Sequence, residues 1–286
     1  MSHNGTLYVV ATPIGNLQDI TLRALEILKS VDLIAAEDTR HTAGLLGHFA
    51  IRKKLLAVHE HNERKAADAL LQRLEAGESV ALVTDAGTPG ISDPGALVVD
   101  RLLECGIRVV PIPGASAIVA ALSAAGIAAS AFHFAGFLPA SGSQRRKTLE
   151  TLKPFDATLA FYEAPHRVLD SVADMAAVLG ENRRLTIARE LTKTFESFHR
   201  CPLGEAVAWL AEDSHRQRGE FVLLVEAASK SDQPAGIGDE AVRVLTLLLA
   251  ELPLKQAVRL AAEITGSKKN ALYEHALQLK DGTSDD

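Results

Sequence analysis

At 286 residues the chain is long enough for about two domains, and 47% of its residues are hydrophobic, as in a typical globular protein. Its formal net charge of −6 excludes a protein that binds nucleic acid indiscriminately over its whole surface. The apolar runs fall short of the roughly 20 residues of a membrane span, and no signal peptide is recognisable. Cys105 and Cys201 lack metal-ligand spacing, so we expect no metal, and a cytoplasmic enzyme fits these features.

The first part of the chain alternates apolar runs with helical patterns. The runs that we interpret as strands are residues 6–11, 32–36, 79–83 and 107–110. The patterns that we interpret as helices are residues 21–29, 40–48, 62–76, 95–105 and 117–125, and Asn62 is the expected cap of the third. Such a βα series predicts a mostly parallel sheet with helices on both faces.

A second series follows a weakly patterned segment. Its expected strands are residues 133–137, 158–162, 185–189 and 221–225, with a hairpin arm near 194–201. Its expected helices are residues 144–152, 166–179 and 203–211. Beyond a polar linker come three helical patterns with short breaks, as in a helix-turn-helix, at residues 239–251, 254–264 and 268–279. We therefore predict α/β domains at 1–126 and 127–228, a linker at 229–238 and a helical module at 239–286.

Loops rich in glycine and proline follow three strands of the first series. They are Pro13–Asn16, Thr84–Gly95 and Pro113–Ser116. Glycine lets a ligand approach the backbone closely, and the carboxyl ends of parallel strands meet at one edge of a sheet. Together the loops predict a site for a small molecule such as a nucleoside or an amino acid. No Walker sequence and no G-x-G-x-x-G follows a strand, which disfavours nucleotide hydrolysis and Rossmann-type dehydrogenases.

Five segments carry a family resemblance. They are Ala36–Arg40, Thr84–Gly95, Pro111–Ser116, Phe161–Arg167 and Ala188–Lys193. In these segments the chain closely resembles the ribosomal RNA small subunit methyltransferase I family, which belongs to the tetrapyrrole-methylase-like S-adenosylmethionine enzymes. The likeness covers residues 5–228 and extends to the helical tail. Porphyrin and corrin members carry a first loop of the form G-x-G-x-G. This chain has Pro13-Ile14-Gly15 there instead, which favours the RNA branch.

The resemblance implies two α/β domains of the tetrapyrrole methylase type, with S-adenosylmethionine in the cleft between them, and a homodimer. It also implies methyl transfer to the ribose 2′-oxygen of a cytidine in small-subunit (16S) ribosomal RNA, in the assembled subunit, with the helical module contacting RNA. The residues expected to bind the cofactor are Pro13, Gly15, Asp85, Ala86, Gly87, Thr88, Ser92, Pro113, Gly114, Ala115, Ser116, Tyr162 and Ala188.

Catalysis needs help with the proton, because a ribose hydroxyl is a poor nucleophile at neutral pH. A carboxylate or lysine that takes or orients the proton adds roughly 10²–10⁴-fold. Our candidates are Asp38, Arg189, Glu190 and Lys193. The ordinary alternatives are that Asp38 caps a helix and that residues 189–193 form a solvated run of charges.

Basic residues at several helix starts are candidates for RNA phosphate contacts. They are Arg40, Arg145, Arg146, Arg167, Lys268 and Lys269. A solvated helix face is the alternative for these positions. For the whole chain, two other functions stay open: a tetrapyrrole (precorrin or uroporphyrinogen) methyltransferase of the same fold, or a noncatalytic RNA-binding assembly factor.

Overall fold

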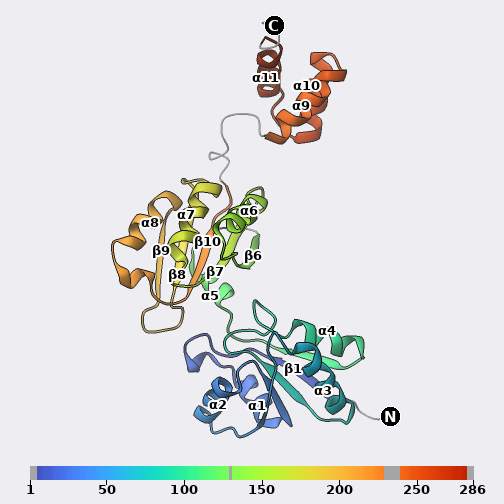
Figure 1. Ribbon diagram of the computed structural model, residues 1–286, viewed down its shortest axis with the longest axis vertical. Coiled ribbons are helices and arrows are strands. Elements are labelled where there is room, and N and C mark those ends of the chain that lie inside the picture. The colour runs from blue at the N-terminus through green and yellow to red at the C-terminus, as the bar shows by residue number, and fades with distance from the viewer. Residues whose placement is uncertain (1–4, 129–130, 229–238, 282–286) are drawn as a thin grey trace. The chain divides into compact units, whose positions relative to one another are not determined.

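A computed structural model describes residues 5–128, 131–228 and 239–281 (Figure 1). The chain divides into two compact units, Met1–Ala227 and Ala228–Asp286. No helix within the described ranges combines the length and apolar character needed to cross a bilayer. The predicted linker at 229–238 lies outside the described residues.

The first sheet is entirely parallel, as predicted, and has the order β3-β2-β4-β1-β5. Its strands are β1 (Thr6–Val10), β2 (Leu33–Ala36), β3 (Lys54–Ala57), β4 (Val80–Val83) and β5 (Arg108–Ile112). Helices α1 (Leu22–Ser30) and α2 (Thr39–His48) pack on one face, and α3 (Glu63–Glu75) and α4 (Ala96–Glu104) on the other. The sequence analysis missed β3, because this four-residue edge strand is only half buried and carries little apolar pattern.

The two central strands, β1 and β4, create the topological switch point of this sheet. The chain leaves β1 toward β2 on one side and leaves β4 toward β5 on the other. The loops that follow these strands therefore start side by side, which is where open α/β sheets bind ligands. Thr12 and Gly87 join them through two backbone hydrogen bonds of 2.9 and 3.0 Å.

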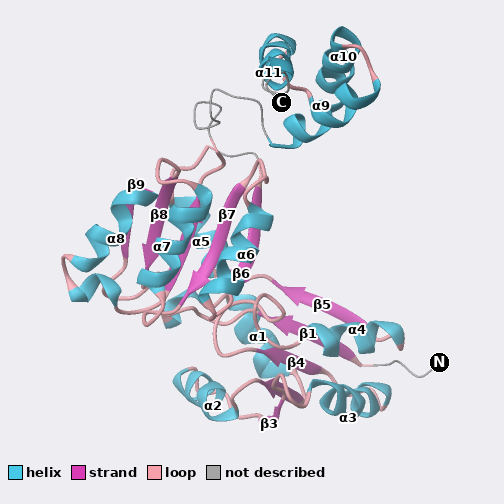
Figure 2. Ribbon diagram, turned by 45° about the horizontal axis from the view of Figure 1, so that its top comes forward, coloured by secondary structure: helices cyan, strands magenta, loops and turns pink. Residues whose placement is uncertain are grey.

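The second sheet has the order β6-β7-β10-β8-β9 and is mostly antiparallel; only β6 and β7 pair in parallel. Its strands are β6 (Phe132–Phe137), β7 (Thr158–Glu163), β8 (Arg184–Arg189), β9 (Ser197–Pro202) and β10 (Phe221–Val225). The hairpin arm expected near 194–201 is instead a single strand, β9, which pairs antiparallel with β8. Helices α6 (Gly142–Leu152), α7 (Val168–Leu179) and α8 (Leu203–Ala211) cover one face (Figure 2).

Helix α5 (Ala117–Ala124) covers the opposite face of this second sheet (Figure 1). Its Ile118 and Ala121 pack against Val222 and Leu224 of β10. The other side chains of β10 face α6–α8, so the strand is buried on both faces. A boundary at residues 126–127 therefore separates α5 from the sheet on which it packs.

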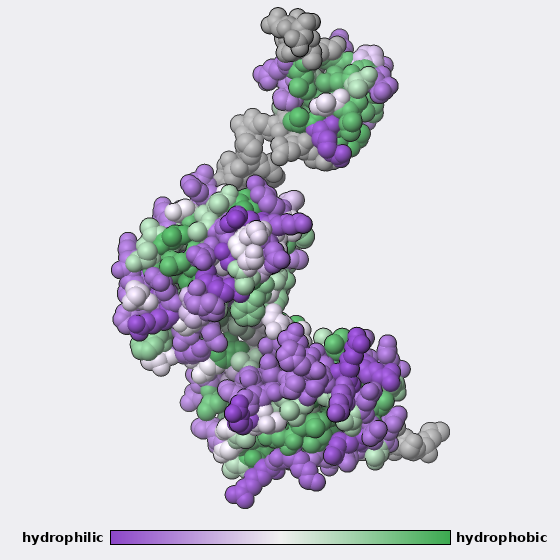
Figure 3. Space-filling model, in the orientation of Figure 1, coloured by the Kyte–Doolittle hydropathy of each residue, from purple (hydrophilic) through white to green (hydrophobic). Residues whose placement is uncertain are grey.

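The C-terminal unit is helical, as predicted, with α9 (Asp239–Glu251), α10 (Leu254–Thr265) and α11 (Lys269–Asp281) around a small core of their own. Gly266 ends α10 in the left-handed conformation, at φ +68°. Hydrophobic side chains also reach the surface of this unit (Figure 3), and Leu247 and Ile264 are the most exposed of its large ones. Single turns of 3-10 helix, η1 (Leu17–Asp19) and η2 (Ser214–Gln217), complete the described structure of the chain.

Candidate active site

Two cavities lie at the carboxyl edge of the first sheet. The interdomain cavity, of about 330 Å³, is bordered by the loops after β4 and β5 and by the ends of β6, β7 and β10. The α2 cavity, of about 540 Å³, is bordered by the loop after β1, by α2 and by Lys193. Both volumes are in the range of small-molecule sites.

The residues predicted to bind the cofactor divide between these cavities. Those on the interdomain cavity are Ala86, Gly87, Thr88, Ser92, Ser116 and Tyr162. Pro13, Gly15 and Asp85 border the α2 cavity instead. The four others, Pro113, Gly114, Ala115 and Ala188, border neither cavity.

Three of these four residues support the walls instead. A Cβ on Gly114 would lie 2.9 Å from the Cβ of Ala11, so the glycine permits close packing against the end of β1. The carbonyl of Ala115 accepts a 3.2 Å hydrogen bond from the Thr88 hydroxyl, which ties two predicted loops together. Ala188 is fully buried against α5.

Asp93 borders the interdomain cavity, and the sequence analysis did not single it out. Its carboxyl group has the clearest pKa shift among the carboxylates of that cavity. Burial raises its pKa to about 6, and the negative charges of Glu37 and Asp85 contribute. Those two residues are joined by a 3.3 Å hydrogen bond from the Asp85 backbone N–H to Glu37 Oε2. A ligand cation would relieve this repulsion, so the cavity favours a positively charged ligand.

Tyr162 forms an aromatic part of the same wall. Its hydroxyl accepts a 3.3 Å hydrogen bond from the Ile118 N–H at the start of α5, which links the two α/β halves. Phe134 and Phe137 lie edge-on to its ring, with centroids 4.8 and 5.6 Å away. Burial raises the pKa of Tyr162, so the hydroxyl stays protonated at neutral pH.

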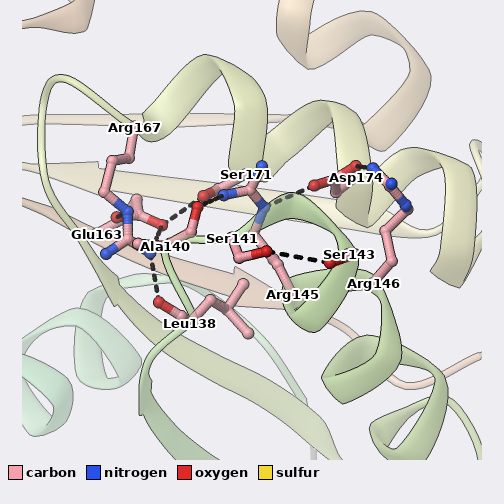
Figure 4. A network of polar contacts seen from close by, with 10 residues as sticks. All are labelled: Leu138, Ala140, Ser141, Ser143, Arg145, Arg146, Glu163, Arg167, Ser171 and Asp174. Carbon is pink, nitrogen blue, oxygen red and sulfur yellow. Dashed lines mark hydrogen bonds and ion pairs between the residues drawn. The ribbon is translucent and has the colours of Figure 1, made fainter.

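Glu163 anchors the loop that closes the interdomain cavity on the side of β7 (Figure 4). Its buried carboxylate accepts hydrogen bonds from the Ala164 N–H, at 2.8 Å, and from the Ser171 hydroxyl. Arg167 pairs with the same carboxylate at 3.3 Å and donates to the Leu138 carbonyl. Arg167 therefore holds two loops together, and its position argues against the phosphate contact expected from the sequence.

Arg145 and Arg146 share one partner, Asp174 of α7, at 2.6 and 2.8 Å (Figure 4). The Arg145 side chain is only 6% exposed, whereas that of Arg146 is 53% exposed. A buried guanidinium reaches a phosphate only by breaking its own ion pair, here with Asp174, and its hydrogen bond to the Ala140 carbonyl. We therefore correct the expectation for Arg145, which joins α6 to α7. Arg146 keeps a surface for RNA.

Lys193 lies at the centre of a second charged group, on the border of the α2 cavity. Its ammonium donates hydrogen bonds to Glu190 at 2.9 Å and to Glu220 at 2.8 Å. Burial alone would lower the pKa of Lys193, but these two hydrogen bonds outweigh it and the pKa is raised. Lys193 is therefore a cation at neutral pH, and its ammonium donates to both carboxylates.

The backbone around this lysine is strained. Glu190 and Thr192 have φ values of +52° and +66°, a conformation that non-glycine residues adopt at a cost of about 1–3 kcal/mol each. The strain is held by neighbouring contacts: the Glu190 N–H donates to the Glu220 carbonyl at 2.9 Å, and the Thr192 N–H donates to Glu196 at 2.6 Å. Such strain is concentrated at functional sites.

Glycines give this segment room on both sides. A Cβ on Gly219 would lie 2.4 Å from the Glu190 side chain. A Cβ on Gly15 would lie 2.5 Å from Cγ of Lys193, so the first predicted loop touches the lysine directly. The Pro13–Asn16 loop and the Ala188–Lys193 segment, remote in sequence, are thus neighbours.

Arg189 stabilises the Ala188–Lys193 segment through hydrogen bonds and borders neither cavity. Its guanidinium donates to the Ser197 hydroxyl at 3.2 Å and to the carbonyls of Phe195, His215 and Arg218 at 3.1–3.2 Å. These bonds tie the hairpin connection to η2. Arg189 borders neither cavity, so these contacts give no support to its predicted catalytic role.

Asp38 is the N-cap of α2, accepting hydrogen bonds from the backbone N–H groups of Arg40 and His41 at 2.7 and 3.4 Å. The Arg40 side chain also bonds to it and holds the pKa of Asp38 below its ordinary value. The structure thus supports the helix-cap interpretation. Arg40 itself is 91% exposed and borders the α2 cavity. Lys268 and Lys269 are exposed at the start of α11.

Known proteins resemble the chain over nearly its full length. A family model described as Tetrapyrrole (Corrin/Porphyrin) Methylases matches residues 6–207, and one described as the RsmI C-terminal HTH domain matches residues 235–280. A ribosomal RNA small subunit methyltransferase I of Escherichia coli O157:H7 is 56% identical over 276 residues, which are 96% of this chain and 95% of that protein. The Pseudomonas aeruginosa protein of the same name is 56% identical over 274 residues, 96% of this chain and 97% of that protein.

The chain belongs to the ribosomal RNA small subunit methyltransferase I family.

Solved structures share the fold of the larger unit of this family member. Diphthine synthase aligns with a TM-score of 0.61 at 15% identity, covering 79% of this chain and 91% of that one. Uroporphyrin-III C-methyl transferase from Thermus thermophilus, complexed with S-adenyl homocysteine, aligns with a TM-score of 0.56 at 18% identity, covering 78% of this chain and 97% of that one. These likenesses establish the tetrapyrrole methylase fold.

Several cavity residues of this family member were not predicted from its sequence. Ile91 and Asp93 belong to a loop that was predicted, so their position in it was the available signal. Glu220 and Val222 lie at the start of β10 and carried no signal. The sequence analysis places ligand residues at the carboxyl ends of strands, but β10 is antiparallel to its neighbours β7 and β8, so its amino end meets the site.

Proposed function

We propose that this chain methylates the ribose 2′-oxygen of a cytidine in small-subunit ribosomal RNA, using S-adenosylmethionine. The observation that carries the proposal is the 56% identity to ribosomal RNA small subunit methyltransferase I over 96% of the chain. The choice of a cytidine, and of its 2′-oxygen, as the acceptor rests on the motif resemblance in the sequence.

The interdomain cavity has the chemistry that S-adenosylmethionine requires. Apolar side chains such as Ile14, Ile91 and Val222 provide surface for the adenosine, and Ser116 and Thr88 provide hydroxyls. Asp93 would face the positive charge that the cofactor carries, and burial beside Glu37 and Asp85 is already unfavourable for that carboxylate. When bound, the cofactor supplies an electrophilic methyl group on a sulfonium. Ala86, Gly87, Ser92 and Tyr162, which border the same cavity, form part of this proposed cofactor site.

In the proposed reaction, the protein contributes mainly by positioning the acceptor hydroxyl. Holding two reacting groups about 3 Å apart and in line provides much of the acceleration. Lys193 is the proposed catalytic group: its ammonium, held by Glu190 and Glu220, donates a hydrogen bond to the acceptor ribose. Glu190 is a positioning residue, because its carboxylate acts through Lys193.

The proposed partner is small-subunit ribosomal RNA in the assembled subunit, met by a homodimer in the cytoplasm. Arg40 and Arg146 on the larger unit, and Lys268 and Lys269 on the helical unit, are the proposed phosphate contacts. All four are exposed. The match of the tail to an HTH domain supports RNA over a tetrapyrrole as the acceptor, because a small substrate needs no such module.

One assay tests this proposal. The protein is incubated with methyl-labelled S-adenosylmethionine and either small ribosomal subunits or uroporphyrinogen, and the labelled RNA is digested to nucleosides. We expect label only in 2′-O-methylcytidine. Label in the tetrapyrrole would establish the alternative enzyme. Absence of cofactor binding by calorimetry would favour a noncatalytic assembly factor.

A further inference from the structure

The α2 cavity adjoins the proposed cofactor site but is a separate cavity. It is the larger of the two cavities, at about 540 Å³. Its walls come from both α/β halves, with Leu17, Arg40 and Gly44 on one side and Lys193 and Glu220 on the other. This volume is large enough for a second ligand, and Lys193 of the strained segment borders it.

The two cavities meet at three residues. Ile14, Ala86 and Glu220 border both of them. A ligand in one cavity therefore approaches a ligand in the other at this junction. The ammonium of Lys193 lies at the same place, 2.8 Å from Glu220 Oε2. Group transfer requires such a junction, because the reacting atoms must come within about 3–3.5 Å of each other.

We propose that the α2 cavity binds the acceptor nucleotide, with its ribose at the junction and a neighbouring phosphate beside Arg40 on α2. This inference rests on the proposed function and adds the location of the acceptor. The nucleotide enters as a single strand with its base splayed out, since proteins reach such bases outside a helix.

The walls of the cavity match a nucleotide in both polarity and charge. Leu17 and Leu45 offer apolar surface to a base or ribose. Arg40 offers a guanidinium, and its present pairing with Asp38 is between solvent-exposed groups, so water already competes strongly with it. A phosphate can therefore replace Asp38 as the partner of Arg40 at little cost. His41 borders the same cavity and adds a hydrogen-bonding ring.

The reaction at the junction balances as follows. The ribose 2′-oxygen forms a bond to the methyl carbon, and the S–CH₃ bond breaks with its electron pair remaining on sulfur. The hydroxyl proton passes to the carboxylate of Glu220, which borders both cavities and is open to solvent. Lys193 is already protonated and donates a hydrogen bond, so it does not compete for that proton.

Helix α2 supplies a matched pair of variants as a test. Gly44 borders the cavity, whereas Gly47 lies one turn further along the same helix and does not. Both glycines are exposed, and a Cβ added to either meets nothing within 4 Å, so Gly44→Phe and Gly47→Phe both begin in open space. Gly44→Phe adds a ring at the wall of the α2 cavity, whereas Gly47 does not border that cavity.

Three quantities are measured for wild type and both variants: S-adenosylmethionine affinity by calorimetry, small-subunit binding by sedimentation, and the rate of RNA methylation. We expect Gly44→Phe to lower kcat/KM for small subunits by about 100-fold, since small misplacements of a substrate have effects of that order. Its cofactor affinity should stay within about twofold of wild type, and Gly47→Phe should match wild type in all three quantities.

The possible failures are distinguishable. If Gly44→Phe methylates RNA as fast as Gly47→Phe, the acceptor site lies elsewhere and the proposed function survives. If Gly44→Phe instead loses cofactor affinity, the α2 cavity belongs to the cofactor and the inference is overturned. A wild-type protein that leaves small subunits unmethylated overturns the proposed function itself, before either variant is compared.

Discussion

Replacing Asp93 by asparagine should make the protein more stable and its cofactor site weaker. The folded protein holds the pKa of Asp93 at about 6, against an ordinary value of 3.8, chiefly because the carboxyl is buried and secondarily because Glu37 and Asp85 repel its charge. A carboxyl with a raised pKa opposes folding once it ionises. This penalty is absent below the ordinary pKa, grows as the pH rises from about 4 to 6, and is constant above.

The size of the effect follows from those two values. The two pKa values differ by about 2.2, and a difference of one in pKa corresponds to about 1.36 kcal/mol. Ionised Asp93 therefore lowers the free energy of unfolding by about 3 kcal/mol above pH 6. Because the side chain keeps some access to water, we expect Asp93→Asn to gain about 1–3 kcal/mol of unfolding free energy at pH 8 and almost nothing at pH 4.

Urea unfolding of wild type and Asp93→Asn at several pH values between 4 and 8 measures this difference. The control is Asp156→Asn, because Asp156 is exposed. The free energy of unfolding of this variant should differ little from that of wild type at every pH. Calorimetry at pH 8 should show S-adenosylmethionine binding about tenfold more weakly to Asp93→Asn, because its cation loses a carboxylate partner. A stability difference that does not change with pH, or a variant less stable at pH 8, would refute the reasoning.

Three other predictions test the remaining parts of the site. Lys193→Met should lower the single-turnover methylation rate by about 100-fold while cofactor affinity by calorimetry stays within about twofold; an unchanged rate would remove the ammonium from the reaction. Gly219→Ala and Gly180→Ala both force alanine to a positive φ, and each should lose about 1–2 kcal/mol in urea unfolding, but only the Cβ at 219 would displace Glu190, so only that variant should also lose activity. Equal activity of the two variants would show that the position of Glu190 does not affect catalysis. Deleting residues 234–286 should leave cofactor binding intact and impair RNA methylation, and full activity of the truncated protein would exclude a role for the helical unit.

Local pattern was enough to predict most helices and strands, because burial repeats with a period that each element shows by itself. The strand at 80–83 and the Thr84–Gly95 loop after it are an example: an apolar run followed by glycine and proline has few other interpretations. The cap of α2 and the helix-turn-helix-like tail were also predictable from short segments.

Neighbouring arginines show where local pattern fails. Arg145 and Arg146 have the same charge and adjacent places in the sequence, but on a helix they point about 100° apart. Only the packing of α6 on α7 decides that the first is buried against Asp174 and the second stays exposed. The burial of Arg145 therefore counts against the phosphate contact that the sequence analysis expects of it.

The sequence by itself determined the two sheets, the helical unit, the family and the loops that carry the ligand, since each depends on residues close together in the chain. The tertiary structure decided which loops meet. Strand β10 runs antiparallel and so brings Glu220 to Lys193, while α5 packs on the second sheet and so brings Ile118 to Tyr162. Strand direction and helix docking depend on partners far away in the sequence, and no local period encodes them.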